Sequence, residues 1–343
     1  MGLSSIKIQG FTVFEDEEIG FSGGLNVLVG PNGSGKTHLL KLLYAATQAA
    51  DPKVSFSQKT VGCFLPDDYR IARLVKRQQG ANHASVKVSS CKRGLMDGKS
   101  LSMSFNSKTK KWDAVVKGEK AWEAHLAGTK SIFIPAKEIL SNAYNLSAAV
   151  EKNNVSFDDT YIDIINSAKI DVSAGKNTRE KERLLKEIEK AIGGKVDYDS
   201  RKDEFYLRQG GKYLEFPLVA EGIRKIALLW QLVKNGTLEQ GSILFWDEPE
   251  ANVNPAYIPI IVELLLSLQR EGVQVFLSTH DYFISKYIDV RKKKQDQVAF
   301  LSLYLEAGGV KCEKGSSFDA LKNNSIMKTF LNLYQEEVGK AMS

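Results

Sequence analysis

The chain has 343 residues, of which 43% are hydrophobic and 26% are charged, and its formal net charge is +6. These proportions exclude a largely disordered or fibrous chain. The three cysteines, Cys63, Cys91 and Cys312, are widely separated and lack a C-x-x-C spacing, so they predict neither a disulfide framework nor a zinc site.

The first predicted elements are two strands, 6–11 and 13–21, joined by a bend. A glycine turn then leads to an apolar strand at 25–29. The N-terminus shows no secretion signal, and the longest apolar stretches along the chain are too short to cross a bilayer. We therefore expect a soluble, cytoplasmic protein.

Residues 30–37 read Gly-Pro-Asn-Gly-Ser-Gly-Lys-Thr and match the phosphate-binding pattern G-x-x-x-x-G-K-[ST]. An apolar strand precedes this loop and a helical pattern follows it, which is the context that the motif requires. The glycines let backbone N–H groups surround a polyphosphate, and the helix directs its positive end at the same anion. Lys36 is expected to reach the β and γ phosphates, and the Thr37 hydroxyl to bind Mg²⁺. We expect ATP and Mg²⁺ as cofactors, with the nucleotide held by Gly30, Pro31, Asn32, Gly33, Ser34, Gly35, Lys36 and Thr37.

The segment 58–130 is predicted to form a β-rich basic lobe, with strands at 85–90 and 101–105 and a short basic helix at 70–79. From Arg70 to Lys130 there are fourteen Lys or Arg residues and four acidic residues. This excess could bind nucleic acid phosphates. A solvated surface or an acidic partner protein explains it equally well.

The next part of the chain starts with a buried strand at 131–135 and is then mostly helical. An amphipathic helix is predicted at 179–192, followed by a hairpin around Lys202 and Asp203. A further helix is predicted to begin near Gly222. We interpret 137–221 as an inserted helical lobe with a hairpin.

Two apolar strands in the second half end in polar residues. The strand 242–246 ends at Asp247 and Glu248, which is a Walker B pattern with an adjacent glutamate. Asp247, expected on a strand next to the strand of the phosphate loop, can hold Mg²⁺, and Glu248 can deprotonate the attacking water. The strand 274–279 ends at His280, which can contact the γ phosphate. The alternative is that His280 only caps a helix.

In order and spacing, four motifs resemble the ABC-type ATPase heads of the SMC, RecF and OLD group. They are GPNGSGKT at 30–37, the signature-like VAEGIRK at 219–225, ILFWDEPEANVNP at 243–255 and VFLSTHD at 275–281. The resemblance implies one α/β P-loop NTPase domain over 1–343, with a mixed central sheet, an antiparallel β layer and an inserted helical lobe. Within the group, the chain most resembles small bacterial AAA ATPases of phage-defence, abortive-infection and toxin–antitoxin loci.

The resemblance also implies a head-to-tail dimer around two ATP molecules. Gly222 would then face the γ phosphate bound by the partner, and Asn252 and Asn254 would cross the interface. Residues 133–138 would correspond to the junction that carries the Q-loop, although no Q-loop glutamine is visible there.

The signature departs from the family pattern at Ala220, which stands where the family has a serine that contacts the γ phosphate. That contact is then lost or supplied by Arg224 or Lys225, and we expect slow hydrolysis. The insert is too short for SMC-like arms, and the tail after His280 is too short for the OLD nuclease domain.

Three functions compete at this level. The first is an ATPase that dimerises around ATP and acts as a sensor or clamp for a separate effector, such as a nuclease or toxin, in bacterial defence. The second is a RecF-like repair ATPase that binds DNA through the basic lobe. The third is the nucleotide subunit of a membrane transporter, which the strands ahead of the phosphate loop and the long lobe disfavour.

Overall fold

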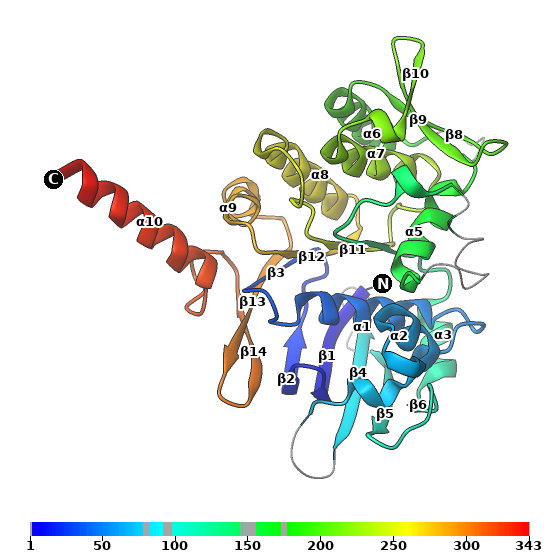
Figure 1. Cartoon of the computed structure of the whole chain (residues 1–343), viewed down its shortest axis with the longest axis vertical. Helices are drawn as coiled ribbons and strands as arrows, with labels where there is room; N and C mark the ends of the chain where they lie inside the picture. Colours follow the sequence, from blue (N-terminus) through cyan, green and yellow to red (C-terminus); the bar gives the residue numbers. More distant parts are fainter. Residues whose placement is uncertain are drawn as a thin grey trace.

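The computed structural model describes residues 2–77, 82–91, 98–144, 146, 156–172 and 177–342. Its centre is a six-stranded sheet in the order β14-β13-β3-β12-β11-β7 (Figure 1). The strands are β3 (Leu25–Val29), β7 (Ser131–Ile134), β11 (Ile243–Asp247), β12 (Gln274–Thr279), β13 (Val298–Glu306) and β14 (Gly309–Gly315). All neighbours pair in parallel except β14, which runs antiparallel to β13. The expected mixed central sheet is confirmed.

The strand order corrects one expectation about the site. β12 lies between β3 and β11, so Asp247 is not on the strand next to that of the phosphate loop. The immediate neighbour of β3 is the strand that leads to His280. A sequence alone does not order parallel strands, because each is joined to the next by a long crossover.

A second, antiparallel sheet covers one face of the central sheet, and its order is β2-β1-β4-β5-β6. It joins the first two strands of the chain to the strands of the 58–130 segment, because β4 pairs with β1. A 3₁₀ turn at Ile71–Leu74 stands where a short basic helix was predicted, and residues 78 and 79 of that prediction lie outside the described ranges. The five strands are β1 (Gly2–Phe11), β2 (Phe14–Gly20), β4 (His83–Cys91), β5 (Lys99–Asn106) and β6 (Val115–Lys117).

The helical part on the other face carries a small three-stranded sheet in the order β10-β9-β8 (Figure 1). The amphipathic helix predicted at 179–192 is α6, and the predicted hairpin is β8 and β9. The elements are α5 (Asp159–Lys169), α6 (Arg179–Ile192), β8 (Lys195–Asp199), β9 (Glu204–Gln209), β10 (Lys212–Glu215) and α7 (Glu221–Lys234). The predicted Gly222 helix is α7.

The central sheet separates two apolar cores, which explains its almost uninterrupted apolar strands. On β11, Leu244 and Trp246 pack with α5 to α9, whereas Ile243 and Phe245 pack with α1 and the antiparallel sheet. This alternation follows the two-residue period of a strand. The remaining helices are α1 (Lys36–Gln48), α2 (Phe56–Phe64), α3 (Glu119–Leu126), α8 (Ile258–Arg270), α9 (Tyr282–Arg291) and α10 (Ser325–Met342).

Helix α10 projects away from the body of the molecule (Figure 1). It has no buried residue, although Phe330 stacks on Tyr282 of α9 with ring centroids 3.9 Å apart. No helix among the described residues is long and apolar enough to span a bilayer.

Candidate nucleotide-binding site

The phosphate loop follows β3 and depends on two glycines for its shape. Gly30 has φ 150°, and a Cβ there would lie 2.2 Å from the carbonyl oxygen of Leu303. Gly35 has φ 86°, and its Cβ would lie 2.8 Å from Phe14. Helix α1 begins at Lys36 directly after this turn, so its free N–H groups face the loop. The backbone therefore has the form that an anion-binding loop requires.

Lys36 folds back over this loop. Its Nζ donates to the carbonyl oxygens of Gly30 at 2.7 Å and Pro31 at 3.0 Å, and the residue is only 6% exposed. Burial lowers the pKa of Lys36, an effect that the nearby carboxylates of Glu248 and Asp247 oppose. The ammonium group is thus held at the mouth of the loop, where a polyphosphate would replace weak carbonyl partners with charged ones.

Asp247 and Thr37 come together although their strands are not adjacent. The Thr37 hydroxyl donates to Asp247 Oδ2 at 2.9 Å, and the Ser278 hydroxyl donates to Oδ1. Burial raises the pKa of Asp247, while the hydrogen bonds from Ser278 and Thr37 act in the opposite direction. A carboxylate and a hydroxyl oxygen at hydrogen-bond distance form a donor set that suits the hard cation Mg²⁺. These two residues fit the metal ligands expected from the sequence.

Glu248 and His280 lie beside each other at the ends of β11 and β12. His280 Nδ1 is 3.2 Å from Glu248 Oε1, and the two side chains are 46% and 28% exposed. Glu248 has φ 45°, a left-handed conformation that costs a non-glycine residue about 1 to 3 kcal/mol and often marks a functional site. The interpretation of His280 as a helix cap is wrong, because Asp281 caps α9 by accepting from Ile284 N at 2.7 Å.

The signature-like segment forms the start of α7. Ala220 is the residue before the helix. Gly222 lies against Val253, and a Cβ added to Gly222 would be 3.3 Å from the Cα of Val253. Arg224 pairs with Glu138 at 2.6 Å and donates to two backbone carbonyls. Lys225 is 1% exposed and donates to the Ala251 carbonyl at 2.6 Å. Both residues proposed as substitutes for the signature serine are thus engaged within their own chain.

The loop after Asp247 is also held by hydrogen bonds within the chain. Asn252 donates to Glu221 at 3.1 Å, and Asn254 accepts from the N–H of Ala256 at 2.9 Å, which caps the 3₁₀ turn Pro255–Tyr257. Both side chains have partners within the chain in this structure. Their expected place at a dimer interface stays a prediction.

Glu250 is a site residue that the sequence reasoning missed. Its side chain is 8% exposed, and its Oε1 accepts from Thr279 Oγ1 at 2.6 Å and from His280 N at 3.2 Å. Burial raises its pKa, and the hydrogen bond from Thr279 opposes this shift. The signal in the sequence was its position two residues after Glu248 in the same loop.

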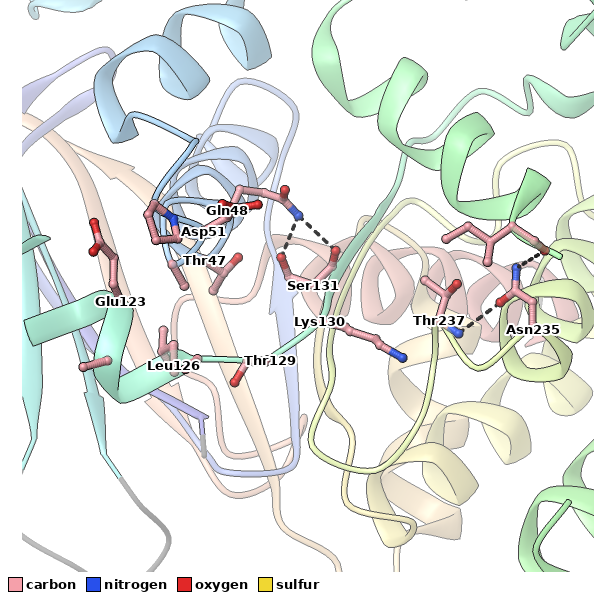
Figure 2. A pocket seen from close by; sticks show the side chains of 16 residues that line it. Thr47, Gln48, Asp51, Glu123, Leu126, Thr129, Lys130, Ser131, Asn235 and Thr237 are labelled. Atoms are coloured by element: carbon pink, nitrogen blue, oxygen red, sulfur yellow. Dashed lines mark hydrogen bonds between the residues drawn. The ribbon is translucent and has the colours of Figure 1, made fainter. Parts of the chain in front are cut away.

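A cavity of about 840 Å³ lies away from these residues, at the C-terminal end of α1 (Figure 2). Gln48 donates to the Ser131 hydroxyl at 2.9 Å on one side, and Asn235 and Thr237 lie on the other. No group of three or more potential metal ligands among histidine, cysteine and acidic residues occurs in the described part of the chain. The motif residues meet at the phosphate loop and not in this cavity.

Two family models of AAA ATPases match parts of this chain. A family model described as "AAA domain, putative AbiEii toxin, Type IV TA system" matches residues 119–285, and one described as "AAA ATPase domain" matches residues 1–71. The DNA replication and repair protein RecF of an Exiguobacterium species is 36% identical over 89 residues, which are 26% of this chain and 24% of that protein. RecF of Streptococcus gordonii is 26% identical over 88 residues, with the same coverage. The matched region thus spans about a quarter of these relatives.

Solved structures of SMC heads share the fold over nearly the whole chain. An SMC head bound to the C-winged helix domain of ScpA has a TM-score of 0.60 at 14% identity and covers 94% of this chain and 100% of its own. The SMC head from Thermotoga maritima has a TM-score of 0.52 at 14% identity and covers 92% and 100%. A Pyrococcus furiosus head bound to ScpA has a TM-score of 0.54 at 12% identity and covers 97% and 98%.

The motifs, the fold and these matches together define the class: the chain is an SMC/RecF-like, ABC-type ATPase head. It is an α/β P-loop ATPase domain with a mixed sheet and an antiparallel layer. More narrowly, the model with the AbiEii description matches the segment that carries the start of α7, Asp247 and His280.

Proposed function

We propose that this ABC-type head binds ATP, hydrolyses it slowly to ADP and phosphate, and dimerises around the nucleotide. In this proposal the ATP-bound dimer is a sensor or regulatory clamp for a separate effector, such as a nuclease or toxin, in bacterial anti-phage defence or a toxin–antitoxin system. The observation that carries it is the convergence of Lys36, Thr37, Asp247, Glu248 and His280 at the carboxyl ends of β3, β12 and β11.

The roles of these residues follow from their positions. Glu248, which is partly exposed, accepts a proton from the attacking water, and His280 contacts the γ phosphate beside it. Thr37 and Asp247 would hold Mg²⁺, whose charge offsets that of the phosphates. Lys36 leaves its two carbonyl partners and binds phosphate oxygens.

The proposal of a dimer rests on Gly222 and its surroundings. The residue lies at the first turn of α7, whose N–H groups favour an anion. Arg224 and Lys225 are bonded to groups of their own chain, and Ala220 has no polar side chain. The contact to the partner's γ phosphate therefore lacks a side-chain donor. A contact missing from the transition state lowers the rate of hydrolysis more than it weakens ATP binding. We therefore expect the dimer to bind ATP and to hydrolyse it slowly.

The effector is placed on another chain for one reason. The described residues hold no group of three or more histidine, cysteine or acidic side chains that could support metal-dependent nuclease chemistry. The matched family description, "putative AbiEii toxin, Type IV TA system", supports a role of this chain in a toxin–antitoxin system and does not bear on whether the effector is separate.

The substitution Glu248→Gln tests this function. It removes the general base but keeps the shape of the side chain, so ATP turnover should fall by about 100-fold or more while ATP binding persists. The variant should accumulate as an ATP-bound dimer, measured as a doubled mass by light scattering after gel filtration. Glu271→Gln, on an exposed turn after α8, is the matched control and should behave like the wild type. Wild-type turnover in Glu248→Gln, or an unchanged mass with ATP, would contradict the proposal.

A second function, RecF-like DNA binding, is favoured by one feature of the antiparallel sheet. On its exposed side, Lys7 of β1 pairs with Lys87 of β4, which pairs with Ser102 of β5, which in turn pairs with Lys117 of β6. The three lysines are exposed and form a row across the sheet. Such a row can neutralise phosphates along a nucleic acid backbone.

This second function has its own test. Reversal of the three lysines to glutamate should abolish DNA binding in a filter or anisotropy assay, and wild-type affinity should fall steeply as salt rises. Arg73 and Lys76 are poorer targets, because they pair with Asp67 at 2.7 Å and Glu15 at 3.1 Å. Binding that is equal in wild type and the triple variant would exclude this surface.

A further inference from the structure

The loops that follow β11 and β12 are joined by one buried carboxylate. Glu250 lies on the first loop, and its Oε1 accepts from Thr279 Oγ1 at 2.6 Å and from His280 N at 3.2 Å on the second. Its Oε2 is buried without a hydrogen-bond partner among the described residues. A buried carboxylate with only one oxygen satisfied is costly, so its presence calls for an explanation beyond packing.

The contacts of Glu250 hold the backbone N–H of His280 and the hydroxyl of Thr279, the residue before it. Thr279 is 0% exposed, and its hydroxyl oxygen also accepts from Asp281 N at 2.9 Å. Asp281 in turn caps α9. His280 lies between these two fixed residues, so its backbone has little freedom, and its imidazole lies 3.2 Å from Glu248.

We propose that Glu250 is a positioning residue, which holds the His280 backbone so that the imidazole stays beside Glu248 and the γ phosphate. The inference rests on the proposed ATPase function and adds to it a residue that acts through another. Glu250 forms no hydrogen bond with Lys36, Thr37 or Asp247 in the structure described, so the proposed role concerns its hydrogen bonds to Thr279 and His280.

The rest of the loop is secured without Glu250. Ala251 accepts from Lys225 at 2.6 Å, and Asn252 donates to Glu221 at 3.1 Å. A change at Glu250 is therefore expected to free His280 while the loop stays attached to α7.

Two substitutions of Glu250 distinguish loss of its hydrogen bonds from loss of its charge alone. Glu250→Ala removes both hydrogen bonds and should lower kcat by about 10-fold or more, with ATP affinity within about 3-fold of wild type. Glu250→Gln keeps an acceptor oxygen and should retain kcat within about 3-fold of wild type. The matched control is Glu313→Ala, since Glu313, like Glu250, accepts two hydrogen bonds, in its case from the backbone N–H groups of Lys322 at 2.9 Å and Asn323 at 2.8 Å, but lies outside the site. It should leave kcat unchanged.

A double substitution tests whether Glu250 acts through His280. If it does, Glu250→Ala combined with His280→Ala should be no slower than His280→Ala alone, because the effects are not additive within one unit. Additive losses, or an ATP affinity that falls as much as kcat, would overturn the inference.

A readout without turnover keeps the inference separate from the proposed function. The chain has four histidines, so the imidazole NMR signal of His280 can be assigned by its loss in His280→Ala. Glu250→Ala and Thr279→Val should both shift this signal, and Glu313→Ala should not. If the wild type hydrolyses no ATP, the proposed function fails, and an unshifted His280 signal in both variants would then refute the positioning role independently. Thr279→Val also serves if Glu250→Ala does not fold.

Discussion

Individual side chains at the phosphate loop have more than one set of partners available to them. Lys36 is buried and bonded to carbonyl oxygens, and Thr37 is bonded to Asp247. In the proposed function, each of these contacts is exchanged when a nucleotide and a cation bind. Glu248 differs from these residues, because its backbone is strained. It has a left-handed conformation, and its carboxylate is partly exposed.

Lys36→Ala gives a prediction at this scale. Loss of a charge-assisted hydrogen bond to phosphate costs about 1.5 to 3 kcal/mol, so ATP affinity should fall by about 10-fold to 100-fold. Titration with a fluorescent ATP analogue measures the change. Lys53→Ala, on an exposed turn, is the control and should bind as the wild type does. Unchanged affinity in Lys36→Ala would show that the loop does not bind the phosphates.

At the scale of elements, one ion pair ties β7 to α7. Glu138 follows β7, and its side chain is 3% exposed, while its partner Arg224 on α7 is 13% exposed. A buried pair contributes little net stability when complete, but its loss on one side leaves an uncompensated charge. The pair thus fixes the start of α7 relative to the central sheet.

The substitution Arg224→Ala should therefore lower the free energy of unfolding by about 3 kcal/mol in urea titrations. In the double variant Glu138→Ala with Arg224→Ala, the free energy of unfolding should fall by less than the sum of the decreases in the two single variants. Arg183→Ala is the control, because its pair with Glu187 at 3.2 Å on α6 is exposed, and it should cost about 0.5 kcal/mol or less. Equal losses at the buried and the exposed pair would contradict this account.

A second pair at this scale predicts a pH dependence. The hydrogen bonds from Arg270 on α8 lower the pKa of Asp296, which precedes β13. A carboxyl group with a lowered folded-state pKa stabilises the fold above its unfolded pKa of about 3.9, and this stability is lost as pH falls through the folded pKa. Asp296→Asn should lower the free energy of unfolding by about 1 kcal/mol at pH 7, and this loss should shrink as pH falls below about 3.9, relative to wild type at the same pH. A pH-independent difference in urea midpoints would refute the charge as the cause.

The whole molecule consists of a compact body and one projecting helix. The exposed fractions of Leu331, Leu333, Tyr334 and Met342 on α10 are 48%, 55%, 58% and 84%, so the distal part of the helix contributes little burial. Helical stability in proteins comes mainly from tertiary packing, which here is confined to the first turns.

Deletion of residues 332–343 should accordingly leave the melting temperature of the body and its ATP affinity unchanged. The circular dichroism signal of helix should decrease, and aggregation should be reduced because an apolar surface is removed. Differential scanning calorimetry measures the first effect. A large fall in the melting temperature would show that the distal helix packs on the body in solution.

The sequence by itself determined the class of this protein and named most residues of its candidate site. Phosphate loops and Walker B motifs rest on local chemistry, since glycines, Lys36 and Thr37 must follow a strand in a fixed order. The amphipathic helix at 179–192 could be predicted for the same reason, because the spacing of its apolar residues is a local pattern.

Tertiary structure decided what depends on contacts between distant segments. It placed β12 between β3 and β11, joined the N-terminal strands to β4 in one sheet, and engaged Arg224 and Lys225 within the chain. Glu250 became a site residue only because its loop lies against Thr279, 29 positions further along the chain. Strand order and buried hydrogen bonds are set by packing between segments that the sequence does not bring together, so no local pattern reveals them.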